Sequence, residues 1–411
     1  MQALPGVFRK ETVVGVDIGS RLMKICYAEP EAGASRWRVT RTSYAATPKD
    51  AVREGVIVDR AATGAALREL LRSAGLSHVT GAVAAVAGPS VIVRHVKMPR
   101  ISEAVLRKSV RYEAAKHISS SIETSAVEFE ILGPVQGDPD KMNVMLVAAP
   151  NDMINSRLDA LELAGLEPIA IDVEAFALQR ALLEMGDAEP LHDTLALLDI
   201  GASSTDVTII THGYFALTRN IPIAGDQFTN AIKNARHCTF EEAEEIKRGI
   251  DMTCLLAPDS DPGKQAMARL VQPTLDELLR EVRRSVNYYQ SQVAEGALPL
   301  PIDPRQLEIS EDAGEARRSP AGGNVSKLLI TGGSAMLLGL QSYMEVRLGA
   351  SVAHGNIFDQ PCLDTTALAP SFIDAHHSIF ALCMGLAIKQ GAAEHAAKAR
   401  KLDAAKAAKA A

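Results

Sequence analysis

Short hydrophobic runs that end in an acidic residue and a glycine mark two places along this chain. They lie at residues 13–20 and 197–206, and in each the run is followed by residues that favour turns. This pattern predicts a strand that opens a β-hairpin. The second acid, Asp199, lies 182 positions after Asp17. The repetition predicts two similar halves, each beginning with a hairpin that has an acid at its turn.

The spacing of hydrophobic residues predicts alternating strands and helices along the rest of the chain. Alternation with a period of two predicts a strand, and apolar residues three and four apart predict a helix. Before residue 190 the pattern predicts a hairpin at 12–28, strands at 37–44, 81–88, 91–97, 128–132, 143–149 and 167–173, and helices at 60–74, 102–117, 151–165 and 174–185. After residue 190 it predicts strands at 194–200, 204–210, 214–220, 327–331 and 351–353, helices at 225–236 and 375–389, and helices that open at Thr239 and Thr274.

This order of elements predicts the α/β class, with two duplicated α/β domains and a subdomain inserted into the first. At 411 residues the chain exceeds the usual capacity of a single core, which agrees with a division into domains. The expected parts are a first core at 12–90 and 169–190, an inserted subdomain at 91–168, a second core at 191–225 and 325–390, a capping subdomain at 226–324 with a flexible loop at 296–324, and an Ala/Lys-rich tail at 391–411.

The turn of the first hairpin contains residue types that bind phosphate and metal ions. Asp17 would hold Mg²⁺ through water, Gly19 would let backbone approach a ligand, and Ser20 would bond phosphate oxygens. Lys24, on the same side of the following strand, would add a positive charge. Taken alone, an ordinary hairpin without a ligand explains this turn as well.

The second hairpin repeats the same chemistry, and this repetition favours a ligand. Asp199 would be a second acid that holds Mg²⁺ through water, and Gly201, Ser203 and Ser204 would bond phosphate. Two acidic hairpins in two similar halves would close on a nucleotide from both sides.

A third motif completes the candidate site. A buried strand at 327–331 ends in Gly332, Gly333 and Ser334 before a predicted helix. Paired glycines at a strand-to-helix turn allow a flat ligand to lie on bare backbone. A tight turn in any α/β protein is the alternative interpretation.

Composition excludes several other classes of protein. Hydrophobic residues make up 47% of the chain and aromatic residues 4%, and the net charge of −7 argues against a dedicated nucleic-acid binder. The five cysteines are scattered without Cys-x-x-Cys spacing, so neither a disulfide framework nor a zinc site is expected. No stretch approaches the roughly 18 apolar residues of a membrane span, so any membrane association would come through a partner.

In their order along the chain, the three glycine motifs resemble the nucleotide site of the superfamily that contains actin, heat-shock chaperones and sugar kinases. The resemblance implies ATP as the ligand, with Glu244 and Lys247 beside the ribose and adenine. It also implies that Glu174 orients the water that attacks the γ-phosphate. Because no arginine finger is visible, we expect at most slow hydrolysis. A salt-bridged surface helix explains Glu244 and Lys247 equally well.

As a whole, residues 12–390 resemble the PilM family, the cytoplasmic actin-like proteins of type IV pilus assembly. The insertion inside the first half is shared with the division protein FtsA, and it separates pilus and division relatives from sugar kinases and chaperones. The matching segments are residues 14–20, 54–59, 93–99, 112–114, 164–168, 171–175, 199–202 and 329–333.

The family resemblance implies a scaffold that binds ATP and Mg²⁺ at the cytoplasmic face of the inner membrane. It would dock the N-terminal tail of a PilN-like bitopic membrane protein in a groove between the first subdomain and the inserted one. The strand at 91–96 and the helix at 105–112 are the segments that we expect to line this groove. Further partners would be other inner-membrane pilus components, the assembly ATPases or further copies of this chain.

Other functions stay open from the sequence. One is enzymatic, either a superfamily phosphotransferase or a true ATPase, although no Asp stands out as an acceptor-site base. Others are a filament-forming, membrane-tethering protein like FtsA and a type II secretion counterpart. The family's aromatic-Ile-Pro-Phe run is replaced here by residues 117–121, His-Ile-Ser-Ser-Ser, which changes the expected fit to the partner. The basic tail would contact anionic lipid or stay solvated.

Overall fold

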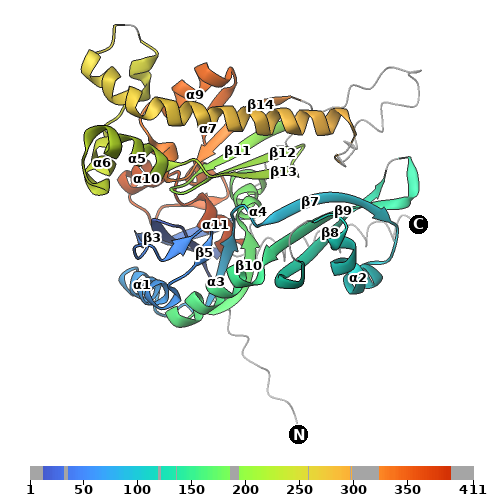
Figure 1. Ribbon diagram of the computed structural model, residues 1–411. Coiled ribbons are helices and arrows are strands. Elements are labelled where there is room, and N and C mark those ends of the chain that lie inside the picture. Colours follow the sequence, from blue (N-terminus) through green and yellow to red (C-terminus); the bar gives the residue numbers. More distant parts are fainter. Residues whose placement is uncertain are drawn as a thin grey trace.

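A computed structural model describes residues 13–31, 36–118, 122–135, 137–185, 194–257, 259–296, 298 and 324–389 of the 411-residue chain. Two sheets that share the order of five strands form the two halves, one above the other in Figure 1, and the first sheet has a sixth strand at one edge. In each, an antiparallel hairpin and a third strand lie on one side, and two parallel strands lie on the other. The predicted duplication and the α/β class are therefore confirmed.

The first sheet has the order β10-β6-β1-β2-β3-β16. Its first strand, β1, is buried at every position, because apolar residues cover both faces. The small hairpin β4–β5 and the helix α1 follow β3, and Gly75, with a positive φ, follows the end of α1. The elements are β1 (Val13–Ile18), β2 (Leu22–Pro30), β3 (Trp37–Ala46), β4 (Val52–Arg53), β5 (Val56–Ile57), α1 (Arg60–Ser73), β6 (Gly81–Val86), β10 (Glu167–Val173) and β16 (Leu363–Asp364).

The second sheet has the order β13-β12-β11-β14-β15. Helices α5, α6, α7 and α9 accompany it, and together they enclose a core built around the fully buried Phe228 and Tyr289. The helix predicted to open at Thr239 is present and begins with a capping box, in which Glu242 accepts a hydrogen bond from the Thr239 amide. The elements are β11 (Thr194–Ile200), β12 (Thr205–Thr211), β13 (Tyr214–Ile221), α5 (Gly225–Arg236), α6 (Phe240–Arg248), α7 (Pro262–Ala294), β14 (Val325–Thr331), α9 (Leu340–Leu348) and β15 (Ser351–His354).

Helix α7 begins earlier than the sequence pattern predicts. The expected start was Thr274, but the helix opens at Pro262 behind the cap Asp261 and continues through Pro273. A proline inside a helix removes one hydrogen bond. Buried residues on both sides of Pro273, including Ala268 and Leu275, keep the two parts of α7 against the same core.

The inserted part of the chain forms a third sheet, of order β7-β9-β8, at the right of Figure 1. Its strands are β7 (Ile92–Pro99), β8 (Ser125–Val135) and β9 (Asp138–Pro150), and α2 (Glu103–Ala115) covers one face. The other face packs on α4 (Glu174–Gln179) and on Phe215 of β13. Strands β7 and β8 are the outer strands of this sheet, and this arrangement leaves a groove beside each.

Helix α3 (Asn151–Ala164) packs with the first half instead of the inserted sheet. Its residues Ala160, Leu161 and Ala164 share a core with β1 and α1. The inserted subdomain was expected to extend to residue 168. Because α3 contributes to the first core, we propose a boundary near Pro150.

The segment before residue 390 also differs from its prediction. An amphipathic helix was expected at 375–389, but the structure has two helices, α10 (Pro370–His376) and α11 (Ala381–Ala387), and every residue of α11 is buried. Helix α11 packs against β1 and α4, and β16 pairs with β3 of the first sheet. These residues, which we had expected within the second core, therefore cover the first sheet.

Two glycines allow α11 to lie in backbone contact with its neighbours. A Cβ at Gly15 would collide with the carbonyl oxygen of Cys383, and a Cβ at Gly385 would collide with that of Ala177. Strand β1, helix α11 and helix α4 are thus packed as one block. Among the described helices, none combines the length and apolar character that a bilayer crossing needs.

Candidate functional site

The first hairpin places Asp17 and Lys24 directly opposite each other on β1 and β2. Their side chains form a short ion pair that is almost fully buried. Burial alone would lower the pKa of Lys24, but the charge of Asp17, with Asp199 nearby, raises that pKa above its usual range. The predicted position of Lys24 beside the acid is therefore present in the structure. Gly19 closes the turn by donating its amide to the carbonyl of Leu22 at 3.0 Å.

The second hairpin has the same turn but a different charge. Gly201 donates its amide to the carbonyl of Ser204 at 3.1 Å, which matches the bond made by Gly19. The residue opposite Asp199 is Asp206, which accepts a hydrogen bond of 3.0 Å from Asn220. Asp206 is not among the site residues predicted from the sequence. It lies 182 residues after Lys24, and the two turn acids are related by the same offset. This offset is the signal that could have identified it.

The two hairpin turns meet across the cleft between the halves. Ser20 donates a hydrogen bond to Ser203 with an oxygen-to-oxygen distance of 3.3 Å. Next to it, Arg21 of the first half forms an ion pair of 3.0 Å with Asp226 of the second half and lies over the ring of Phe240. These contacts hold the cleft closed, so a nucleotide between the hairpins would have to separate them.

The carboxyl groups of Asp17, Glu174, Asp199 and Asp206 gather near the point where the two hairpins meet. Lys24 is paired with Asp17. Burial raises the pKa of Asp199 to about 7, with Lys24 opposing the shift and Asp17 adding to it. Burial also raises the pKa of Asp206 to about 6. The pKa of Glu174 lies well above its usual range because of burial and repulsion by Asp17 and Asp206. A cluster whose acids resist ionisation is a place where a cation is favourable.

The glycine pair Gly332–Gly333 lies beside the second hairpin. Gly332 has φ +90°, and a Cβ there would collide with the carboxylate of Asp199. Gly333 is exposed, and a Cβ there would meet no atom, so its backbone is open to a ligand. Ser334 donates a hydrogen bond of 2.7 Å to the carbonyl of Gly201. The structure thus joins the third motif to the second.

Glu244 and Lys247 also lie near the turn of the second hairpin. They form an ion pair of 2.6 Å, and Lys247 also donates to the hydroxyl of Thr229 at 2.8 Å. The ammonium group lies 3.3 Å from the carbonyl of Gly225, whose amide in turn bonds Gly201. The pair is partly buried against the start of α5 and is therefore not a solvated surface pair. All the predicted site residues of the second half are brought together.

No group of three or more His, Cys, Asp or Glu side chains within the described ranges is arranged to ligate a metal directly. An ion at Asp17 and Asp199 would therefore need other ligands, such as water or phosphate oxygens.

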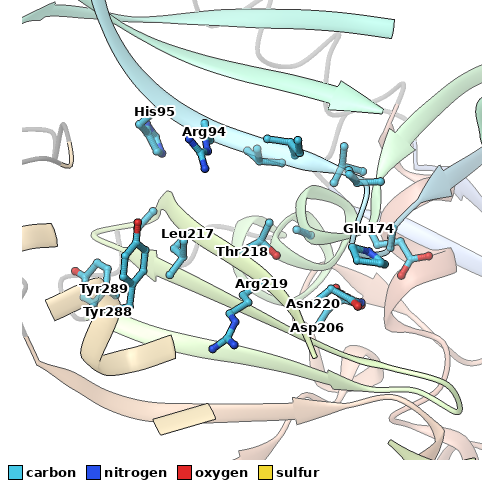
Figure 2. Close-up of a pocket in the computed structure, with 18 of the residues that line it drawn as sticks. Arg94, His95, Glu174, Asp206, Leu217, Thr218, Arg219, Asn220, Tyr288 and Tyr289 are labelled. Carbon is cyan, nitrogen blue, oxygen red and sulfur yellow. The ribbon is translucent and has the colours of Figure 1, made fainter. Parts of the chain in front are cut away.

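A cavity of about 500 Å³ opens beside the acidic cluster (Figure 2). It runs between β7 and β13, each an outer strand of its sheet, and Tyr288 of α7 lies at the end away from Glu174. His95 bridges the two strands with a hydrogen bond of 3.0 Å to the carbonyl of Phe215. The lining includes Glu174 and Asp206 but not Asp17 or Asp199. Residues 91–95 of the predicted groove strand at 91–96 line this cavity.

A second cavity, of about 310 Å³, lies between the first half and the inserted sheet. We call it the β8–β10 groove, because it is bordered by β8 and β10, the outer strands of their sheets. Its lining is mostly apolar, with acidic side chains from β8. The lining residues are Val86, Ala126, Glu128, Phe129, Glu130, Met145, Val147, Ala149, Ile154, Ile171, Asp172, Val173, Phe176 and Lys389. The predicted groove segments 91–96 and 105–112 are absent from this lining.

Comparison with known proteins relates these features to a family. The family model described as "Type IV pilus assembly protein PilM" matches residues 15–297, which is more than half of the chain. The chain belongs to the PilM family. The match covers both hairpins and the inserted sheet. The predicted membership is confirmed.

Solved structures agree with the assignment of the fold. A structure described as a PilM–PilN type IV pilus biogenesis complex is 24% identical, with a TM-score of 0.73 over 93% of this chain and 98% of the other. MreB5 of Spiroplasma citri bound to AMPPNP is 12% identical, with a TM-score of 0.50 over 95% of this chain and 99% of the other. The predicted actin-like fold is confirmed.

Relatives by sequence include the cell division protein FtsA of Pseudomonas aeruginosa. It is 36% identical over 142 residues, which are 29% of this chain and 33% of that protein. The chain spans between 33% and 48% of the length of the curated FtsA relatives it matches. The similarity therefore covers only part of those proteins.

Proposed function

We propose that this PilM family member is an ATP-binding scaffold of the type IV pilus assembly complex, which docks the N-terminal tail of a PilN-like membrane protein. The β8–β10 groove supports the docking role most directly. It lies between the first half and the inserted sheet, where the tail is expected. The scaffold would then sit at the cytoplasmic face of the inner membrane through this partner, near further pilus components such as the assembly ATPases.

The groove has the features of a site for an extended peptide. Both bordering strands are outer strands, so each has one edge without a neighbouring strand in its sheet. A peptide strand added to such an edge is held by main-chain hydrogen bonds, and its alternate side chains enter pockets. The apolar lining, with Met145, Val147 and Ile171, would receive apolar side chains of the tail. The PilM–PilN complex that shares this fold supports the choice of partner.

We further propose that Mg-ATP binds where the two hairpins meet. Ser20, Ser203 and the neighbouring turn amides would bond the phosphates, together with Gly19, Gly201, Ser204 and Lys24. Asp17 and Asp199 would hold Mg²⁺ through water, and the bound ion would supply charge neutralisation for the phosphates. The raised pKa of Asp199 fits this assignment, because burial and the neighbouring acids disfavour its ionised form and a bound cation would offset both.

The nucleoside would lie on the other side of the second hairpin. The open backbone of Gly332–Gly333, with Ser334, would receive a flat base, and Glu244 and Lys247 would bond the ribose edge. Glu174 would orient water near the terminal phosphate. We expect slow turnover, because the two arginines that line the adjacent cavity, Arg94 and Arg219, already have other partners. Arg94 bonds the carbonyl of His117, and Arg219 pairs with Glu281.

Titration calorimetry tests the docking role. The titrant is a synthetic peptide with the cytoplasmic N-terminal residues of a PilN-like protein from the same organism. We expect saturable binding that is lost in Ala126→Trp, which fills the groove from β8, and kept in Leu132→Trp, which places the same ring on β8 outside the groove lining. Absence of binding to the unchanged chain would refute the docking role.

Titration with Mg-ATP separates the nucleotide role from the docking role. We expect heat of binding for the unchanged chain and at least a tenfold loss of affinity in Asp17→Asn and in Asp199→Asn. Peptide binding measured without nucleotide should survive both changes. If ATP fails to bind while the peptide still does, the scaffold role stands and the nucleotide site is wrong.

A further inference from the structure

The described part of the chain ends at the β8–β10 groove. Lys389, at the end of the α11 segment, lines the groove and forms an ion pair of 2.8 Å with Asp172. Helix α11 cannot move away easily, since Gly385 lies in backbone contact with Ala177 of α4. Lys389 is therefore fixed at the wall of the groove, two positions before the segment 391–411.

Negative charge is in excess around this groove. Glu128 and Glu130 are exposed on β8 and line it. Glu184 lies within the electrostatic range of Asp172 and Glu130, and burial together with those two charges raises its pKa. The nearby cations Arg180 and Lys389 both pair with Asp172. Within the described part of the chain, Glu128 forms a distant ion pair, 3.9 Å, with Arg107. The acidic side chains of β8 are thus available to a basic ligand.

The C-terminal segment has the complementary composition. Residues 391–411 contain five Lys or Arg and two acids, a net charge of +3, and most of the other residues are Ala. The basic residues are Lys398, Arg400, Lys401, Lys406 and Lys409. Leu402 is the largest apolar side chain, and three of the basic residues lie within the four positions before it. Small apolar residues between cations suit a groove with an apolar floor and an acidic border.

We propose that the basic segment 391–411 docks in the β8–β10 groove of its own chain and competes there with the membrane partner's tail. The regulatory role rests on the proposed docking function. The contact between the segment and the groove does not depend on that function. Because the segment is attached at the groove, its effective concentration is about millimolar. A segment with an intrinsic affinity of about 0.1–0.3 mM would then weaken the partner roughly four- to elevenfold.

Removal of the basic charges tests the competition in the full-length chain. In Lys398→Gln/Arg400→Gln/Lys401→Gln, we expect the partner tail peptide to bind roughly four- to tenfold more tightly by calorimetry. The control is Lys49→Gln/Lys233→Gln/Lys264→Gln, which removes three exposed cations elsewhere and should leave the affinity unchanged. Equal affinities for the unchanged chain and the tail variant would overturn the competition.

A disulfide test detects the contact without any partner. Leu402→Cys is combined with Glu130→Cys in the groove, or with the exposed Lys108→Cys on α2 as the matched control. Four of the five native cysteines are buried and Cys238 is partly exposed, so Cys238→Ser is included in both variants. We expect intrachain disulfide formation at least fivefold faster with Glu130→Cys. Equal rates would refute docking, whether or not the partner tail binds.

Anionic lipid is the other destination for a basic segment, and vesicle flotation distinguishes it. The probe is vesicles of phosphatidylcholine with 30% phosphatidylglycerol. If the tail variant loses flotation while the disulfide rates are equal, the segment serves the membrane and the proposal is wrong. If the Glu130→Cys pair forms preferentially, the groove is the binding place regardless of the flotation result.

Discussion

Lys24 and Asp206 occupy equivalent positions in the two hairpins, and they have opposite charges. Lys24 lies opposite Asp17 on β2, and Asp206 lies opposite Asp199 on β12. The first hairpin is therefore internally neutral, and the second has two adjacent acids. In the closed structure, Asp199 depends on Lys24 across the cleft for positive charge. A cation placed between the hairpins would offset the negative charge of the second hairpin without displacing the ion pair of the first.

Replacement of Lys24 should affect both stability and ligand binding. In Lys24→Gln, Asp17 is left buried without its partner, and removal of one member of a buried pair costs about 3–5 kcal/mol of the free energy of unfolding. Affinity for Mg-ATP should fall at least tenfold, since a phosphate-binding cation is lost. Denaturant titration and calorimetry measure the two effects.

The control for Lys24 is Lys24→Arg, which keeps the charge in a different shape. We expect it to recover most of the stability but only part of the affinity, because a planar guanidinium does not replace a compact ammonium group in a close-packed site. Unchanged ATP affinity in Lys24→Gln would place the nucleotide elsewhere.

Asp199 should make the ligand-free protein less stable as pH rises. Its folded pKa, about 7, is above the unfolded value of 3.8. Between these values the folded state binds more protons than the unfolded state, so the free energy of unfolding falls as pH increases from about 4 to 7. In Asp199→Asn this contribution disappears. We expect a smaller decrease of the apparent Tm between pH 5 and pH 8 than in the unchanged chain.

The comparison for Asp199→Asn is Asp374→Asn, which changes an exposed acid outside the cleft. It should leave the pH dependence of Tm as it is. Saturating Mg-ATP should flatten the pH dependence of the unchanged chain, because the ion stabilises the ionised carboxylate. If Asp199→Asn and the unchanged chain lose stability in parallel, the raised pKa is not the cause.

The sequence predicts the two hairpins well because the residues that determine each hairpin turn are neighbours along the chain. The strand, the acid and the glycine follow one another within eight residues, and an offset of 182 relates the halves. The same offset identifies Asp206 only when strand pairing is considered, because Asp206 acts through its neighbour across the hairpin and not through its own turn. The contacts of Glu244 and Lys247 with Thr229 depend on the packing of α6 on α5, which no local pattern specifies.

Long-range packing explains the wrong predictions. Residues 379–388 are apolar on every face of α11, which is typical of a buried helix. The periodicity alone does not show that this helix packs on the first sheet. Helix α3 has an ordinary cap and length, and only its contacts assign it to the first core. The β8–β10 groove depends on how two sheet edges face each other, so its lining segments could not be selected from the sequence.

Gly332 should be more sensitive to alanine than other glycines in left-handed conformations. It has φ +90°, and a Cβ would also collide with the Asp199 carboxylate and the Ile200 carbonyl. Gly349 has φ +69°, and a Cβ there would meet no atom. Gly349→Ala should cost about 1–2 kcal/mol from backbone strain alone. Gly332→Ala should cost at least about 1 kcal/mol more and should also weaken Mg-ATP binding. Denaturant titration and calorimetry check both, and equal costs would show that Asp199 moves aside.

Gly385 should be essential for the block formed by β1, α11 and α4. A Cβ at this position would collide with the carbonyl of Ala177, which belongs to a helix backbone that cannot rotate away as a side chain does. We expect Gly385→Ala to lower the free energy of unfolding by about 3 kcal/mol or more. The same change should weaken binding of the partner tail, because Lys389 and Asp172 at the groove are held by α11 and β10.

Gly263→Ala is the matched control for Gly385→Ala. Gly263 is also helical, and the nearest atom to a Cβ there is the flexible carboxylate of Asp261 at 3.1 Å. Alanine favours a helix over glycine by up to about 1 kcal/mol, so this variant should be as stable as the unchanged chain or slightly more so. If Gly385→Ala also keeps its stability and its peptide affinity, α11 is free to shift on α4. In that case, the groove is not fixed by backbone contact.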